Sequence, residues 1–154
     1  MEATNQKKLY RKVLVIDDNP TDRFIAEKMI EKCGFAQQTI LCESAQEALE
    51  YLGALEHEPD ELPQLIFLDI SMPGMDGYGF LEQYAKFSEV VRTRSIILML
   101  TTSLHPDDIT RAQNNPFVAR FINKPISRDK LDMIRNDFPI VYQRVLLKSL
   151  SLHL

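Results

Sequence analysis

The sequence predicts a doubly wound α/β domain in which five parallel strands alternate with five helices, a (βα)5 order, followed by an extra helical segment at the carboxyl end. Three observations favour this class. Short β-branched, apolar runs alternate with apolar residues at helical spacing, most of these runs end in polar residues, and 154 residues suffice for one hydrophobic core but not for two. We expect a polar extension over 1–11, one domain over 12–137 and an amphipathic segment over 138–154.

The first predicted strand covers 13–16 and ends at the Asp17-Asp18 pair. Asn19 can cap the helix that follows, because its side chain can accept a hydrogen bond from a free backbone N–H, and Pro20 fits the first helical position. Gly34 ends this helix. Its buried face is expected to consist of Phe24, Ile25, Met29, Ile30 and Cys33.

The second strand is expected over 39–42. Ser44 and Glu47 form a capping box at the start of the next helix, whose apolar stripe extends to Leu55. The acidic, proline-containing segment over 56–63 is interpreted as a connection to which the sequence assigns no function.

The third strand, over 65–69, is apolar until it reaches Asp69, and it passes directly into a Pro/Gly-rich turn over 72–77. A helix with an inward apolar face follows near Phe80. This pattern is typical of a buried strand that presents one carboxylate at its carboxyl end.

The last two strands are expected over 95–100 and 117–122. Pro106 opens the helix between them. A hydrophobic staple around Ser127 begins a further helix that runs to about Asp137.

Polar residues follow four of the five strands, namely Asp17 and Asp18, Asp69, Thr101, and Lys124. The carboxyl ends of parallel strands meet at one edge of the sheet, where reactive groups and ligands gather. Three carboxylates about 5 Å apart repel one another by about 3 kcal/mol per pair at an effective dielectric constant near 20, so the cluster favours a cation. Oxygen ligands alone favour Mg²⁺. Each acid alone could be a helix cap or a turn former, but that interpretation does not predict their convergence.

With these motifs the sequence resembles the response regulator receiver domain, the phosphoacceptor module of two-component signalling, from about residue 12 to residue 137. The resemblance rests on the Asp17-Asp18 pair, the segment from Leu68 to Gly77, Thr101 and the Lys124-Pro125 pair. It implies a flavodoxin-like fold. It also implies that Asp69 accepts a phosphoryl group from the phosphohistidine of a sensor histidine kinase or a phosphotransfer protein.

The resemblance implies Mg²⁺ ligation by Asp17 or Asp18, Asp69 and the main-chain carbonyl of Ser71, and phosphoryl binding by Thr101 and Lys124. It further implies a cis peptide bond between Lys124 and Pro125, which X–Pro bonds adopt at low cost. Thr101 and Phe121 would form the switch, in which Phe121 fills the space that Thr101 leaves. Many members carry tyrosine at this position, so a readout through its hydroxyl is excluded here. A plain core aromatic is an equally good interpretation of Phe121.

Three other functions fit parts of the pattern. A phosphatase of the haloacid-dehalogenase type uses a D-x-D-x-T motif, and the sequence from Asp17 to Thr21 matches it except that Asn19 replaces the second acid. A phosphate-independent adaptor with a receiver fold would lose pocket residues, whereas this chain keeps the full set. A flavin-binding protein would share the architecture alone. We therefore expect a signalling domain rather than an enzyme.

Composition restricts the partners. The net charge of −4 arises from interspersed acids and bases without a basic face, so we expect no nucleic-acid partner. No apolar stretch has membrane-spanning length and no secretory signal is visible, so we expect a cytoplasmic protein. Because no output domain is recognised, the domain should act on an unidentified protein partner, directly or as a phosphorelay intermediate. The segment over 138–154 could form a homodimer or pack on its own domain.

Overall fold

The structure is a computed structural model that describes residues 9–102 and 105–140. Its centre is one five-stranded sheet in the order β2-β1-β3-β4-β5, and every neighbouring pair of strands is parallel. The strands are β1 (Tyr10–Ile16), β2 (Ala36–Cys42), β3 (Leu65–Asp69), β4 (Ile96–Thr101) and β5 (Val118–Asn123). The prediction of a doubly wound, flavodoxin-like α/β fold is confirmed.

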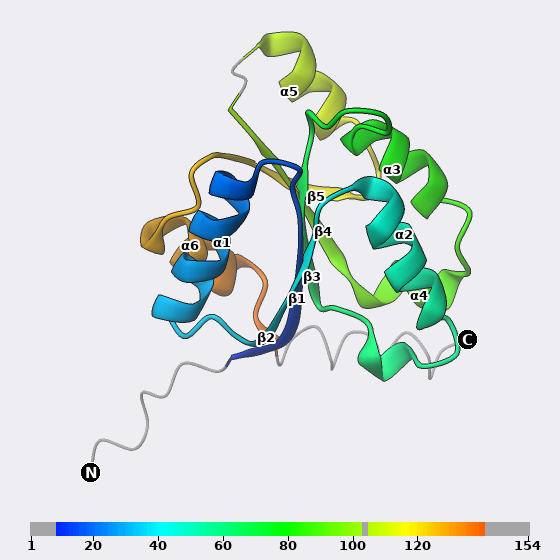
Figure 1. Cartoon of the computed structure of the whole chain (residues 1–154), viewed down its shortest axis with the longest axis horizontal. Coiled ribbons are helices and arrows are strands. Elements are labelled where there is room, and N and C mark those ends of the chain that lie inside the picture. Colours follow the sequence, from blue (N-terminus) through cyan, green and yellow to red (C-terminus); the bar gives the residue numbers. More distant parts are fainter. Residues whose placement is uncertain (1–8, 103–104, 141–154) are drawn as a thin grey trace.

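Helices cover both faces of this sheet. They are α1 (Pro20–Lys32), α2 (Ala45–Ala54), α3 (Gly77–Tyr84), α4 (Glu89–Arg94), α5 (Pro106–Gln113) and α6 (Arg128–Asp137). Figure 1 shows α1 and α6 on one face and α2, α3, α4 and α5 on the other. None of the helices in the described part of the chain is long and apolar enough to cross a membrane.

The alternation of side chains along β1 divides the core into two layers. Val13 and Val15 pack in the layer under α1 and α6, together with Ile30 and Leu131. Leu14 and Ile16 belong to the opposite layer, and all four strand residues have no exposed surface. The strand is apolar on both faces because helices cover both faces.

Strands β4 and β5 begin one residue later than expected, and the larger differences concern β1, β2 and one helix. Strands β1 and β2 each begin three residues earlier than predicted, at Tyr10 and Ala36. Helix α4 was not predicted, because its six residues are too few to show helical periodicity and only Val91 is buried.

The predicted buried face of α1 was partly wrong. Phe24 is 60% exposed and Ile25 is 36% exposed, whereas Ala26 and Ile30 are buried. Ala26 lies two positions after Phe24, which is about 200° around the helix, so the two side chains point in nearly opposite directions. The buried stripe is therefore centred on Ala26 and Ile30, and Phe24 faces away from the sheet.

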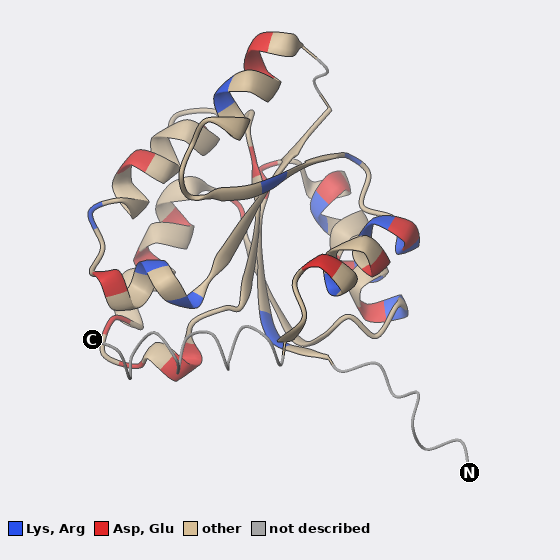
Figure 2. Ribbon diagram, turned by 180° about the vertical axis from the view of Figure 1, so that it is seen from behind, with Lys and Arg blue, Asp and Glu red and all other residues tan. Residues whose placement is uncertain are grey.

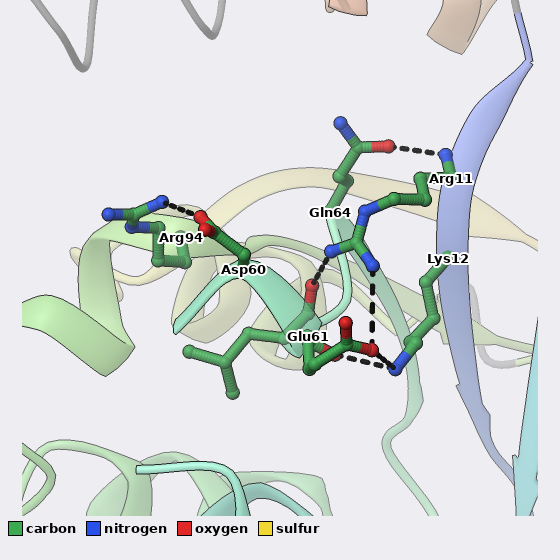
Figure 3. Close-up of polar contacts among 7 residues, drawn as sticks. Arg11, Lys12, Asp60, Glu61, Gln64 and Arg94 are labelled. Carbon is green, nitrogen blue, oxygen red and sulfur yellow. Dashed lines mark hydrogen bonds and ion pairs between the residues drawn. The ribbon is translucent and has the colours of Figure 1, made fainter. Parts of the chain in front are cut away.

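Hydrogen bonds and ion pairs join the acidic connection over 56–63 to β1 and α4 (Figure 3). It contains a short 3₁₀ helix, η2 (Pro59–Glu61). The buried Lys12 ammonium donates to the Glu61 carbonyl at 2.6 Å and lies 3.4 Å from the Glu61 carboxylate. Arg94 of α4 pairs with Asp60 at 3.1 Å. The segment thus has a structural role that its polar sequence did not predict.

Acidic and basic residues are interspersed over the outer helices (Figure 2). Beyond α6, Phe138 and Ile140 pack against the core layer of α1 and α6. The rest of the predicted amphipathic segment, and with it the predicted homodimer contact, lies outside the described residues.

Candidate functional site

Asp69 is the last residue of β3 and lies at the carboxyl edge of the sheet. The turn that follows is held against it. Gly77 donates its N–H to the Ile70 carbonyl at 2.9 Å, and a Cβ atom on Gly77 would lie 2.7 Å from the Asp69 carbonyl oxygen. Asp76 caps α3 by accepting from the N–H of Gly79 at 2.8 Å. The glycine therefore allows the turn to approach the strand end closely, which fixes Asp69.

Three carboxylates gather at this edge. Asp17, Asp18 and Asp69 each offer one oxygen, and these oxygens lie within 4.8 Å of one another. Asp17 is 1% exposed and Asp69 is 4% exposed, while Asp18 is less buried. Burial and the charge of Asp17 raise the pKa of Asp69 from its usual 3.8 to about 7, although Lys124 opposes them. Such an acidic cluster can bind a metal ion.

Lys124 places one ammonium group among three carboxylates at this edge. Its Nζ lies 2.7 Å from Asp17, 3.0 Å from Asp22 and 3.3 Å from Asp69. The lysine side chain is 9% exposed. Burial lowers the pKa of Lys124, but the hydrogen bonds that its ammonium group donates to Asp17 and Asp22, together with the charge of Asp69, outweigh that effect, so its pKa lies above the usual value. The ammonium group is therefore charged when the carboxylates are charged.

Thr101 and Ser71 complete the edge. Thr101 ends β4 and is 2% exposed, and its carbonyl accepts from the N–H of Lys124 at 2.8 Å. Ser71 is exposed and donates its N–H to an Asp69 carboxylate oxygen at 3.4 Å. The peptide bond between Lys124 and Pro125 is cis. The residues predicted to bind the metal and the phosphoryl group therefore lie at the carboxyl edge of the sheet, on the ends of four strands or directly after them.

Comparison with known families is decisive for the class of protein. The sequence model of the response regulator receiver domain matches residues 13–135. The chain belongs to this family.

Relatives of the receiver domain come from archaea, bacteria and plants. The chain is 32% identical over 119 residues to the probable methanogenesis regulatory protein FilR2 of Methanothrix harundinacea, covering 77% of this chain and 75% of that protein. It is 32% identical over 122 residues to the sensor histidine kinase CheAY of Helicobacter pylori, covering 79% of this chain but 14% of the kinase. It spans 55% of the two-component response regulator ORR1 of Oryza sativa subsp. japonica, with 27% identity over 130 residues that make up 83% of this chain.

Solved structures agree with the receiver fold. A two-component response regulator from Cytophaga hutchinsonii superimposes with a TM-score of 0.78 at 25% identity, covering 84% of this chain and 97% of that one. A response regulator receiver protein from Dyadobacter fermentans gives a TM-score of 0.75 at 28% identity, covering 84% and 98% of the two chains.

Phe121 of the receiver domain is half-buried on β5, opposite Met99 of β4. It packs against the core layer that α2, α3, α4 and α5 cover. This position suits both a core aromatic and a switch side chain, so the two interpretations of Phe121 stay open.

Asp22 was missed by the sequence analysis. It lies in the first turn of α1, five residues after Asp17, and its carboxylate pairs with Lys124 at 3.0 Å. Acidic residues are common in the first turn of a helix because they interact favourably with the helix dipole. The sequence alone therefore gave Asp22 an ordinary explanation, and only the fold brings it to the lysine.

Proposed function

We propose that this receiver domain accepts a phosphoryl group on Asp69 from the phosphohistidine of a sensor histidine kinase or a phosphotransfer protein, and signals through a protein partner. One observation supports the proposal most directly. The buried Asp69 carboxylate lies beside two further carboxylates and within 3.3 Å of a buried ammonium group, at the strand edge of a receiver fold. No purely structural role needs this concentration of buried charge.

The reaction forms a bond between an Asp69 carboxylate oxygen and phosphorus while the bond from phosphorus to the donor imidazole breaks. The ammonium group of Lys124 is within reach of the incoming phosphoryl oxygens, and Thr101 lies at the same edge on the end of β4. Hydrolysis of the acyl phosphate by water later restores Asp69. The phosphorylated state of the protein is therefore temporary.

The residues present fit a magnesium ion. Hard oxygen ligands are what Mg²⁺ prefers, and Asp17, Asp18 and Asp69 provide three of them within 4.8 Å. The main-chain carbonyl of Ser71 is proposed as a further ligand. When bound, Mg²⁺ supplies positive charge that neutralises the carboxylates and the transferring phosphoryl group.

The proposed partners follow from the chemistry and from the relatives. A histidine kinase or a phosphotransfer protein is the donor that the reaction needs, and the relative CheAY is itself named a sensor histidine kinase. The cytoplasm is the proposed compartment, because the free thiols of Cys33 and Cys42 suit reducing conditions. The downstream target would be a protein that distinguishes the phosphorylated surface from the unphosphorylated one.

Phosphorylation of the purified protein tests the proposal. Acetyl phosphate with Mg²⁺ should label the unsubstituted protein to about one phosphate per chain, and Asp69→Asn should abolish the labelling, because an amide cannot form the acyl phosphate. Asp129→Asn is the matched control, since it removes an exposed carboxylate in the first turn of α6. Full labelling of Asp69→Asn would refute Asp69 as the acceptor.

A further inference from the structure

Lys124 has a carboxylate partner that lies outside the acidic cluster. The residues that offer clustered oxygens to a metal ion are Asp17, Asp18 and Asp69, and Asp22 is not among them. Yet the Asp22 carboxylate lies 3.0 Å from Nζ, closer than the 3.3 Å between Nζ and Asp69. One lysine thus joins two members of the cluster to a fourth acid on α1.

The start of α1 is anchored, so the position of Asp22 is well defined. The N–H of Asp22 donates to the Asn19 side chain at 3.0 Å, which caps the helix. Arg23, the next residue, donates to the main-chain carbonyl of Asp17 at 2.8 Å. The helix end and the end of β1 are therefore tied together, and the Asp22 carboxylate is held next to the lysine.

A cation and Lys124 compete for the same oxygens. Asp17 and Asp69 contact the ammonium group at 2.7 and 3.3 Å, and both belong to the cluster that can hold a metal ion. When a divalent cation takes these two carboxylates, their attraction for the lysine weakens. Asp22 is free of that competition and can keep its ion pair.

We propose that Asp22 is a positioning residue that retains the ammonium group of Lys124 on the α1 side of the site while a divalent cation occupies Asp17 and Asp69. The inference rests on the proposed function, because it concerns the same metal and phosphoryl site. It adds a role for a residue that contacts neither the metal nor the phosphoryl group. Without Asp22, the ammonium group of Lys124 would pair with Asp17 and Asp69 alone. It would then compete more strongly with the cation for these two carboxylates.

Mg²⁺ titration followed by amide chemical shifts or calorimetry measures this competition without any phosphoryl transfer. Asp22→Asn should weaken Mg²⁺ binding about fivefold, the size expected for losing one ion pair to a carboxylate that is 34% exposed. Lys124→Met should bind Mg²⁺ more tightly than the unsubstituted protein, because the competing ammonium group is gone. Asp129→Asn should leave the affinity unchanged, because Asp129 is an exposed first-turn acid that neither pairs with Lys124 nor belongs to the acidic cluster.

Removing any nearby negative charge weakens cation binding somewhat, whether or not Asp22 acts through Lys124. The double variant Asp22→Asn/Lys124→Met separates these two effects. If Asp22 acts through Lys124, adding Asp22→Asn to Lys124→Met should change the affinity less than twofold. An equal loss in both backgrounds, or no loss in the single variant, would overturn the inference. Asp22→Ser also removes the charge and suits the first turn of a helix. It should weaken Mg²⁺ binding as Asp22→Asn does, and it replaces Asp22→Asn in the test if that variant does not fold.

The outcomes also separate this inference from the proposed function. Absence of Mg²⁺ binding by the unsubstituted protein would overturn both the proposed metal site and the role of Asp22. Binding that Asp22→Asn leaves intact would overturn the role of Asp22 alone.

Discussion

Asp69→Asn should stabilise the protein at alkaline pH in the absence of divalent cations. The pKa of Asp69 is raised from 3.8 to about 7 by burial and by Asp17, so the folded protein keeps this proton to a higher pH than the unfolded chain does. Between these two values the native state binds more protons, and the free energy of unfolding contributed by Asp69 falls as the pH rises. The gap between 3.8 and about 7 corresponds to about 4 kcal/mol once both states are ionised.

Asparagine resembles the protonated acid in shape and charge, so the variant avoids this loss. We expect Asp69→Asn to be about 2 to 4 kcal/mol more stable than the unsubstituted protein at pH 8, and equally stable at about pH 3, below both pKa values. Urea unfolding followed by circular dichroism, in EDTA and at several pH values, measures the difference. Asp129→Asn should show no such trend because Asp129 is exposed. A variant no more stable at pH 8, or a difference that does not grow from pH 3 to pH 8, would refute the reasoning.

Two further predictions concern positions away from the carboxylate cluster. Glu61→Gln should lower the free energy of unfolding by about 1 kcal/mol, because the buried Lys12 ammonium loses its carboxylate partner and keeps the Glu61 carbonyl; equal urea midpoints for the two proteins would contradict it. Gly77→Ala should cost about 1 to 3 kcal/mol and slow phosphorylation, because its Cβ would lie 2.7 Å from the Asp69 carbonyl oxygen. Gly79→Ala is the matched control, since its Cβ meets the flexible Met75 side chain at 2.7 Å.

The strand ends could be predicted from the sequence because the signal is local. The apolar run before Asp69 is fully buried, and its carboxylate is the first polar side chain at the end of that run. Thr101 follows its strand in the same way, and Lys124 comes directly after β5. Parallel order then brings these ends to one edge, so the convergence follows from topology without any side-chain detail.

Features that depend on packing geometry could not be predicted. Asp22 reaches Lys124 only because α1 returns over the edge of the sheet, and its sequence position indicates nothing more than a favourable helix start. Phe24 was placed inside because apolar residues at helical spacing usually face the core, yet the stripe turned out to centre on Ala26. The ion pairs of the 56–63 connection join residues far apart in the chain, such as Lys12 and Glu61, and periodicity carries no information about them.

The burial of Asp69 both destabilises the ionised domain and shapes the proposed chemistry of the site. The raised pKa means that Asp69 keeps its proton to a higher pH than an ordinary aspartate, and a protonated carboxyl group is a poor nucleophile. A cation at the cluster would displace that proton, since the ion and the proton compete for the same oxygens. The burial that destabilises the ionised domain thus ties the reactivity of Asp69 to cation binding. Lys124 alone does not achieve this, because its charge is shared among Asp17, Asp22 and Asp69 and still leaves the pKa of Asp69 raised.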